Sequence, residues 1–174
     1  MSLNEIQIGI TTKCNAHCEF CYRKYFEYDV FDMNTKSILS VKKHTNSVVF
    51  CGSLGDACLH EDIFEILEYF NDIKITLNTN GGVFDKYFWH KFGSFFTKNN
   101  SVLIFDLDSF YGIDKHRKVN VDNVKQNIIA AREAGANVQI KTILFDYNLD
   151  HICDIKSFAN QIGAKHIQIY SYTY

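Results

Sequence analysis

The sequence predicts an α/β protein, a partial (βα)6 TIM-like barrel of parallel strands. Six short apolar runs have the length and the β-branched or aromatic content of strands, and amphipathic helical patterns separate them. Strict alternation of strands and helices favours a parallel sheet with right-handed crossovers. Eight strands would be needed to close a TIM barrel, and no helical pattern follows the sixth run. We therefore expect an open sheet or a partial barrel whose last helix is missing.

The first predicted strand covers residues 5–10, where Ile6, Ile8 and Ile10 alternate with other residues and share one face. The other five predicted strands cover residues 48–51, 73–78, 102–107, 138–144 and 166–170. In folds of this class, ligands bind beyond the carboxyl ends of the strands. The loops that follow these strands are therefore where we expect a functional site.

The clearest helical pattern covers residues 62–70, where apolar residues recur at i, i+3, i+4 and i+7. Asp62 and Glu65 predict a capping box at its start. Four further helices are predicted at residues 35–43, 84–92, 121–134 and 153–162. Gly135 and Gly163 follow the last two of these, in the position where glycine commonly ends a helix.

Length and composition favour one domain over residues 1–174. The net charge of -2 leaves no overall basic field, so charge offers no support for a nucleic-acid-binding protein. The chain has no run of about 18 apolar residues, and its N-terminus lacks the apolar core of a signal peptide, so we expect a cytoplasmic protein that does not enter the membrane. In that reducing compartment, a tight group of three of its six cysteines indicates metal binding rather than disulfides.

The segment CNAHCEFC directly follows the first predicted strand, in a loop where a site is expected. Its cysteines, Cys14, Cys18 and Cys21, are the predicted metal ligands. Three thiolates on a short loop can bind three irons of a cubane and leave the fourth iron open. A structural zinc ion instead needs four protein ligands in a closed tetrahedron.

A zinc site is the alternative interpretation of these cysteines, with His17, Cys51 or Cys58 as the fourth ligand. We expect His17 to be a solvated loop residue, because it lies inside the loop next to Cys18. Cys51 and Cys58 are expected to be small residues near the site or in the core.

The pattern CxxxCxxC, with the aromatic Phe20 just before the last cysteine, resembles the signature of radical S-adenosylmethionine (SAM) enzymes. The resemblance implies that Cys14, Cys18 and Cys21 hold a 4Fe-4S cluster whose open iron is chelated by SAM. It further implies that an electron from the cluster cleaves SAM to a 5'-deoxyadenosyl radical, with Phe20 beside the cofactor. The protein would supply ligation, orientation and exclusion of water.

The segment GSLGDACLH at residues 52–60 resembles the GGEP-type segment that binds the SAM amino group in this family. Gly55 and Asp56 stand at its second glycine and its glutamate. Glycine lets the backbone approach a ligand closely, and a carboxylate suits an ammonium group. The segment departs from the pattern because aspartate is shorter than glutamate and Ala57 replaces the usual proline. An ordinary glycine turn is the alternative.

The later strands end in further segments similar to the family's pattern. NTNGG, at residues 78–82, resembles the STNG segment, which makes Asn80 a candidate SAM contact, although Asn-Gly alone is a common turn. FDLDS, at residues 105–109, resembles the S-[IL]-D-G strand end and makes Asp108 a candidate for ribose hydroxyls or substrate.

Two candidates lie farther along the chain. Arg117 is a candidate bidentate partner of the SAM carboxylate, or else a solvated charge beside a helix. Asn148 follows the fifth predicted strand and is either a cofactor contact or the cap of the next helix. The sequence indicates no particular catalytic residue.

The resemblance implies a radical SAM enzyme that abstracts hydrogen from an unknown substrate. The candidate substrates are a peptide, a protein and a nucleic acid. The core resembles most the branch that modifies peptides and proteins. A reductant such as flavodoxin or ferredoxin is implied, and a partner subunit that completes the site is compatible with the short chain. The alternatives are an activase of a glycyl-radical enzyme, a non-catalytic iron-sulfur or SAM-binding protein, and the zinc-binding protein.

Overall fold

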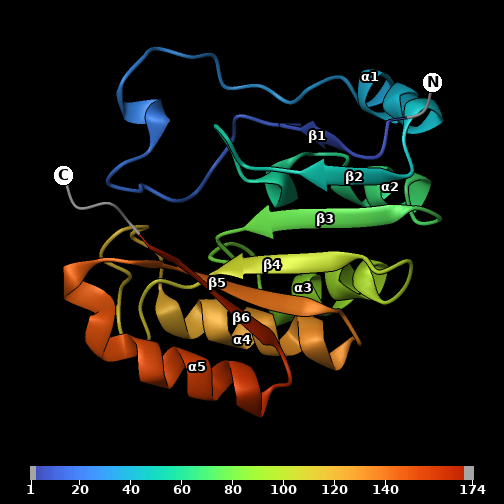
Figure 1. Ribbon diagram of the computed structural model, residues 1–174. Helices are drawn as coiled ribbons and strands as arrows, with labels where there is room; N and C mark the ends of the chain where they lie inside the picture. The colour runs from blue at the N-terminus through green and yellow to red at the C-terminus, as the bar shows by residue number, and fades with distance from the viewer. Residues whose placement is uncertain (1–2, 171–174) are drawn as a thin grey trace.

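The computed structural model describes residues 3–170 and contains one sheet of six parallel strands in the order β1-β2-β3-β4-β5-β6 (Figure 1). The strands are β1 (Ile6–Ile8), β2 (Ser47–Phe50), β3 (Lys74–Thr79), β4 (Val102–Asp106), β5 (Val138–Leu144) and β6 (Lys165–Tyr170). β1 and β6 are the two edges of this sheet, so it is not closed. The predicted open α/β sheet of parallel strands is confirmed.

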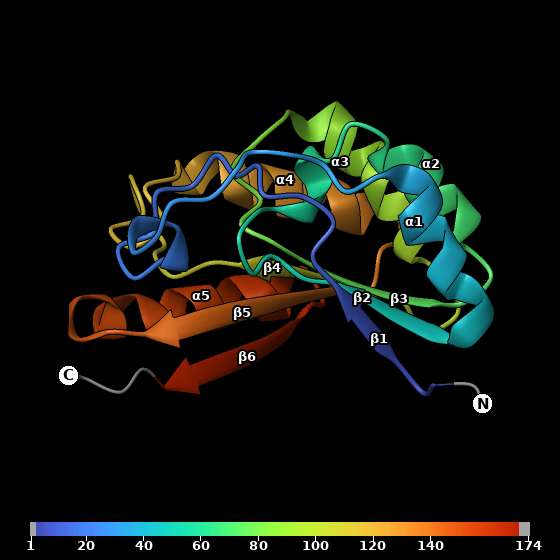
Figure 2. The ribbon, with the colours of Figure 1, turned by 90° about the horizontal axis from the view of Figure 1, so that it is seen from above.

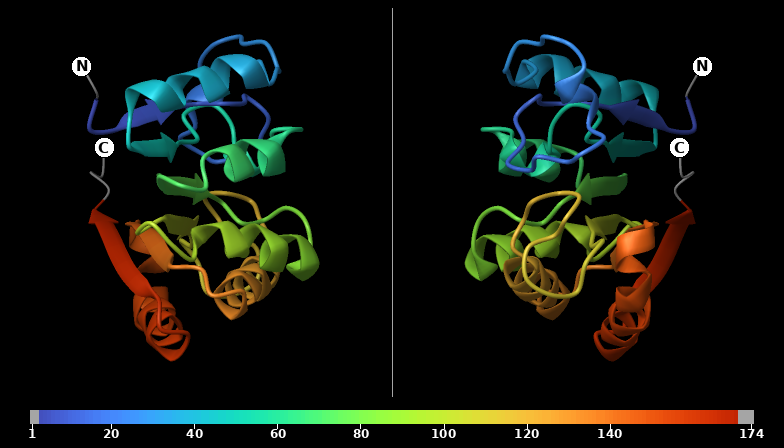
Figure 3. Two further views of the ribbon diagram at one scale, coloured as in Figure 1. Left: turned by 90° about the vertical axis from the view of Figure 1, so that its right-hand side faces the viewer. Right: turned by 90° about the vertical axis from the view of Figure 1, so that its left-hand side faces the viewer.

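Five α-helices connect successive strands, as the alternation predicts. They are α1 (Thr35–Ser40), α2 (Ile63–Tyr69), α3 (Lys86–Gly93), α4 (Val121–Glu133) and α5 (Ile152–Gln161). The helices follow the outer face of the curved sheet (Figures 2 and 3). α4 and α5 end before Gly135 and Gly163, whose φ angles of 89° and 66° suit the left-handed conformation that glycine adopts easily. None of the helices in residues 3–170 is long and apolar enough to cross a membrane.

The predicted capping box at the start of α2 is wrong. Asp62 is the N-cap residue, but its side chain makes no capping hydrogen bond. Its Oδ2 instead accepts a hydrogen bond from Thr35 Oγ1 at 2.6 Å. The side chain therefore joins α2 to α1, a contact between segments 27 residues apart that local spacing cannot predict.

Side-chain alternation on the strands separates a helix-facing side from an inner side. Ile75 and Leu77 of β3 are fully buried, as are Leu103 and Phe105 of β4. The residues between them belong to the inner face, where polar side chains gather toward the carboxyl ends of the strands. These polar residues are Asn78 of β3, Asp106 of β4 and Lys141 of β5. The sheet register places Asp106 directly opposite Lys141.

Candidate functional site

The three cysteines of the CxxxCxxC segment lie beyond the carboxyl end of β1, in the loop where the fold predicts a site. Cys14, Cys18 and Cys21 are half-buried free thiols. All three line one cavity of about 350 Å³. The spacing of the sequence thus brings three potential ligands to one cavity at the carboxyl edge of the sheet.

Backbone hydrogen bonds fix the cysteine loop to segments that follow other strands. His17 N donates to Arg117 O at 2.9 Å, and Glu19 N donates to His116 O at 3.0 Å. On the other side of the loop, Asp56 N donates to Lys13 O at 2.7 Å. The loops after β1, β2 and β4 therefore hold the cysteine loop in place as one unit.

An N–H donor lies near each of the three sulfur atoms. Arg23 Nε is 3.4 Å from Cys21 Sγ, and Asn80 Nδ2 is 3.8 Å from Cys14 Sγ. Arg117 Nη1 is 4.0 Å from Cys18 Sγ. Donors around the ligating sulfurs are typical of iron-sulfur sites, where they stabilise thiolates and tune the reduction potential.

The thiol pKa values show what the ligands require before they can bind a metal. Burial raises the pKa of the Cys14 thiol to about 11 and also raises the pKa of Cys18. The positive charges of Arg23 near Cys14 and of Arg117 near Cys18 act in the opposite direction. Cys14 and Cys18 are therefore protonated at neutral pH until a metal displaces their protons.

The candidate fourth ligands for zinc do not complete a closed site. Among residues 3–170, no group of three His, Cys, Asp or Glu side chains is close enough to hold a single metal ion. His17 is exposed, as predicted, and Cys58 is buried with its Sγ 3.0 Å from Asp56 Oδ1. Cys51 is half-buried and its Sγ lies 3.7 Å from Ser53 Oγ. Three thiols with nearby N–H groups are the donor set that a three-thiolate cluster needs.

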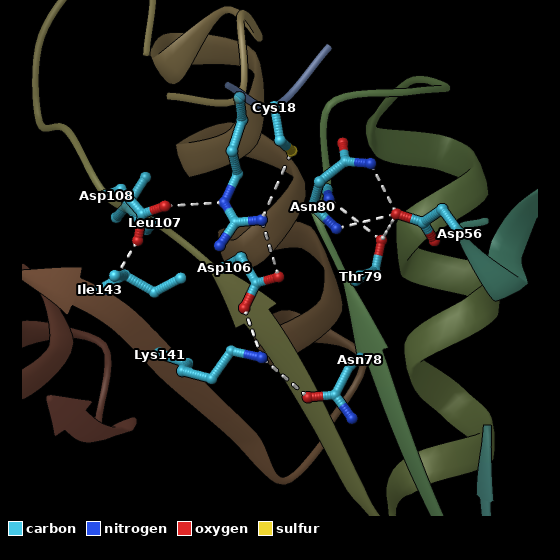
Figure 4. A network of polar contacts seen from close by, with 12 residues as sticks. Cys18, Asp56, Asn78, Thr79, Asn80, Asp106, Leu107, Asp108, Lys141 and Ile143 are labelled. Carbon is cyan, nitrogen blue, oxygen red and sulfur yellow. Dashed lines mark hydrogen bonds and ion pairs between the residues drawn. The ribbon is translucent and has the colours of Figure 1, made fainter. Parts of the chain in front are cut away.

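Asp56 lines the cavity, but its carboxylate is occupied by hydrogen bonds within the chain (Figure 4). Oδ2 accepts from Thr79 Oγ1 at 2.9 Å and from Asn80 N and Nδ2 at 2.8 and 2.6 Å. Oδ1 accepts from Cys58 N and Sγ at 3.3 and 3.0 Å. Burial raises its pKa, which the hydrogen bonds partly offset. A carboxylate offers about four lone-pair sites, so these contacts occupy it. Because the partners belong to the segments after β2 and at the end of β3, Asp56 is the junction between the two.

Asn80 connects that junction to the cysteine loop. Its Nδ2 donates to Asn15 Oδ1 at 2.9 Å, and its Oδ1 accepts from Gly82 N at 2.8 Å. Gly81 between them has a φ of 65°. The Asn-Gly turn is therefore present, and the contact of Asn80 with SAM stays a prediction.

Gly55 is required for the close approach of two backbones. A Cβ at this position would lie 2.8 Å from Lys13 O and even closer to Thr11 O. These carbonyls belong to the start of the cysteine loop. The glycine thus lets the segment after β2 pack directly against the segment that carries the ligands, an effect separate from any contact with a cofactor.

We expect Gly55→Ala to displace the cysteine loop, because backbone atoms cannot move aside like a flexible side chain. The cost should be about 1–3 kcal/mol of unfolding free energy, with a lower iron content after anaerobic reconstitution. Gly9→Ala is the matched control, since its Cβ would meet only Cys51 O, at 3.9 Å. Urea unfolding and iron analysis measure the two effects, and equal values for the two variants would refute this role of Gly55.

Arg117 is buried, with 8% of its surface exposed, so the solvated alternative is wrong. Its Nη1 is 3.2 Å from Asp106 Oδ2, and its Nε is 2.9 Å from Asp108 Oδ2. Burial disfavours the charged guanidinium, but Asp106 and Asp108 outweigh this effect and raise the pKa of Arg117. Arg117 is therefore a fixed cation between two carboxylates and Cys18.

Asp108 and Asn148 lie outside the cavity lining and connect the segments that surround it. Burial raises the pKa of Asp108 to about 6, and the charge of Arg117 partly offsets that increase. Asp108 Oδ1 accepts from Ile143 N at 2.7 Å. Asn148 Nδ2 donates to Asp108 O and Ile143 O at 2.7 and 2.8 Å. The Asn148 side chain therefore ties the loop after β5 to the end of β4. Its Oδ1 also accepts from Phe145 N at 2.9 Å and so caps the 3-10 helix Asp146–His151, which leads directly into α5.

Seven of the ten predicted site residues line the cavity. These are Cys14, Cys18, Cys21, Gly55, Asp56, Asn80 and Arg117. Asp108 and Asn148 lie behind it. Phe20 is 62% exposed, and its ring stacks at 5.8 Å on His116 and at 6.1 Å on Phe145.

The cavity lining includes residues that the sequence analysis missed, among them Arg23, Asn78, Asp106 and Lys141. The last three could have been predicted from the sequence, because they are polar residues on the inner face near the carboxyl ends of three successive strands. Arg23 had only its proximity to Cys21 as a signal.

Comparisons with known proteins agree with this geometry. Residues 8–159 match the family model described as the radical SAM superfamily. A GTP 3',8-cyclase from Aquifex aeolicus (strain VF5) is 26% identical over 181 residues, which cover 93% of this chain and 54% of that protein. A probable GTP 3',8-cyclase from Methanococcus aeolicus is 25% identical, over 93% of this chain and 57% of that protein. The chain thus spans little more than half the length of these relatives.

Solved structures share the fold at low sequence identity. Streptococcus suis SuiB bound to S-adenosylmethionine superimposes with a TM-score of 0.81 and 16% identity, over 99% of this chain and 42% of that one. Native anSMEcpe with bound AdoMet gives a TM-score of 0.70 and 14% identity, over 97% of this chain and 51% of that one. With the family match over most of the sequence and three cysteines on one cavity, the chain belongs to the radical SAM superfamily of enzymes.

Proposed function

We propose that this chain holds a 4Fe-4S cluster on Cys14, Cys18 and Cys21, binds SAM beside it, and abstracts a hydrogen atom from a peptide or protein substrate. The observation that carries the proposal is the convergence of three half-buried free thiols on one cavity, each with an N–H donor nearby. When bound, the cluster supplies the electron that cleaves SAM to a 5'-deoxyadenosyl radical. The remaining tasks of binding and orientation fall to the residues around the cavity.

The charges of the cavity suit the groups of SAM. The Arg117 guanidinium is the partner for the SAM carboxylate, and Asp106 and Asp108 keep it in place. The close packing of Gly55 and the hydrogen-bonded Asp56 hold the segment after β2 in the shape that faces the amino group. Asn80 adds an amide next to Cys14. Phe20 offers an exposed ring at the edge of the ligand loop.

Two supports favour a peptide or protein as substrate. Structures with the same fold include SuiB bound to the precursor peptide SuiA, with a TM-score of 0.73, and anSMEcpe bound to a peptide, with a TM-score of 0.68. The cavity of this chain also carries balanced rather than strongly positive charge, because Asp106 and Asp108 pair with Arg117 and Lys141. A substrate with several negative charges would have to displace these internal pairs.

A nucleotide is the second candidate substrate, because the two sequence relatives are described as GTP 3',8-cyclases. In either case the cluster needs an external electron, and a flavodoxin or ferredoxin is the proposed donor.

Deuterium transfer can distinguish the two substrate classes. Peptides and nucleotides are prepared from cells grown in heavy water and returned to ordinary water, so that only carbon-bound deuterium remains. Each mixture is incubated with reconstituted protein, SAM and dithionite, and the mass of the 5'-deoxyadenosine formed is measured. We expect a one-deuterium increase with peptides and none with nucleotides. An increase with nucleotides alone would replace the peptide proposal by the second candidate.

A further inference from the structure

Three polar residues on the inner face of the sheet form a group next to the cluster ligands. Asn78, Asp106 and Lys141 come from β3, β4 and β5, and all three line the cavity that contains Cys14, Cys18 and Cys21. Figure 4 shows Lys141 between Asp106 and Asn78, with Asn80 at the end of β3 and Asp56, from the segment after β2, beside it. The side chains of Lys141 and Asp106 are only 22% and 12% exposed. A lysine at this depth needs partners or a ligand.

Lys141 has more hydrogen-bonding capacity than its neighbours use. Its Nζ donates to Asn78 Oδ1 at 3.2 Å and forms an ion pair with Asp106 Oδ1 at 2.8 Å. An ammonium group has three N–H donors, and no other partner of Nζ occurs within residues 3–170. The amide nitrogen of Asn78 likewise has no acceptor within that part of the chain. Two neighbouring side chains thus offer spare donors in the cavity.

The charges of the group select the kind of acceptor it can bind. Lys141 and Arg117 are two cations, and Asp106 and Asp108 are two carboxylates in contact with them. A further anion beside Lys141 would be repelled by Asp106, the carboxylate with which Lys141 is already paired. A neutral acceptor meets no such cost. The carbonyl oxygen of an amide is neutral and has two lone pairs.

We infer that Lys141 and Asn78 form a substrate-anchoring site that donates hydrogen bonds to a carbonyl oxygen of a peptide backbone or side-chain amide. This inference rests on the proposed function and names the part of the substrate that the chain recognises. Held there, the carbonyl fixes which neighbouring C–H group lies beside the cofactor. Lys141 and Asn78 act as positioning residues.

Asp106 connects this anchoring site to the cluster. Its two carboxylate oxygens contact different cations, Oδ1 facing Lys141 and Oδ2 facing Arg117. Arg117 in turn lies beside Cys18. Asp106 therefore fixes the anchoring site relative to the ligand loop through two ion pairs. The folded chain thus sets the distance between the bound carbonyl and the cofactor.

The test uses Lys141→Met, which keeps the length of the side chain and removes its donors and charge. Deuterium transfer from the deuterated peptide mixture to 5'-deoxyadenosine should fall roughly tenfold to a hundredfold, the loss expected for hydrogen bonds from a charged donor. Asn78→Leu, which leaves the ion pair of Lys141 with Asp106 intact, should reduce transfer by up to about tenfold. Lys125→Met is the matched control, because Lys125 is ion-paired with Asp122 and 20% exposed but lies outside the cavity lining.

A second readout does not depend on turnover. Acetylation of the Lys141 amine by an N-hydroxysuccinimide ester, followed by mass spectrometry, should slow when the peptide mixture and SAM are present, while acetylation of Lys125 stays constant. Iron content and the EPR signal of each variant establish that cluster loading is retained.

The outcomes separate this inference from the proposed function. Deuterium transfer by Lys141→Met and Asn78→Leu within twofold of the control, without protection of Lys141, would overturn the anchoring site and leave the proposed function intact. No transfer from peptides by the wild-type chain would overturn the peptide proposal, and the anchoring site with it.

Discussion

Replacing Cys18 by alanine is expected to abolish cluster assembly, and with it all formation of 5'-deoxyadenosine from SAM. Two thiolates cannot hold three irons of a cubane. The exposed His17 is the nearest alternative donor in sequence, and Cys58 is buried against Asp56. Iron and sulfide analysis after anaerobic reconstitution measures the effect.

Cys153→Ala is the control for this variant, because Cys153 is an exposed free thiol on α5 and lies outside the cavity lining. It should reconstitute like the wild-type chain. A Cys18→Ala protein with a full cubane spectrum would contradict the ligand assignment.

Asp56→Ala is expected to destabilise the fold by about 2–4 kcal/mol, because it leaves several buried donors without an acceptor. These donors are the Thr79 hydroxyl and the backbone N–H groups of Cys58 and Asn80. The same change should weaken SAM binding, since the segment after β2 loses its attachment to the end of β3. Urea unfolding of the cluster-free protein gives the first effect, and SAM titration followed by EPR gives the second.

Two comparisons make the Asp56 result specific. Asp72→Ala removes an exposed aspartate that pairs with Lys42, and a surface pair of this kind contributes about 0–1 kcal/mol. Asp56→Asn retains one acceptor oxygen and should lie between wild type and Asp56→Ala. If Asp56→Ala unfolded at the same urea concentration as Asp72→Ala, the junction would not have the structural role described above.

Local patterns predicted the fold because each element had a signal within its own residues. Alternating isoleucines placed β1, the i, i+3, i+4 and i+7 pattern placed α2, and glycines marked the ends of α4 and α5. The strand at β1 is shorter than predicted, Ile6–Ile8 rather than residues 5–10. The capping box failed because the Asp62 side chain accepts from Thr35 instead, and no local rule includes that residue.

The site was predictable where its residues adjoin in sequence. The cysteines follow a strand at a spacing that is informative by itself. The pairs of Arg117 with Asp106 and of Asp106 with Lys141 depend instead on the register of β4 and β5 and on the path of the loop after β4. The burial of Arg117 beside Cys18, 99 residues away in sequence, is a property of the assembled sheet.

The central claim, that the three cysteines hold a cluster that cleaves SAM, is tested most directly by one measurement. The chain is reconstituted anaerobically with iron and sulfide, reduced with dithionite and mixed with SAM, and the products are separated by chromatography while the cluster is followed by EPR. The account predicts 5'-deoxyadenosine together with a cluster signal that SAM perturbs. Tightly bound zinc in place of iron, or a cluster whose spectrum SAM leaves unchanged and which yields no 5'-deoxyadenosine, would contradict it.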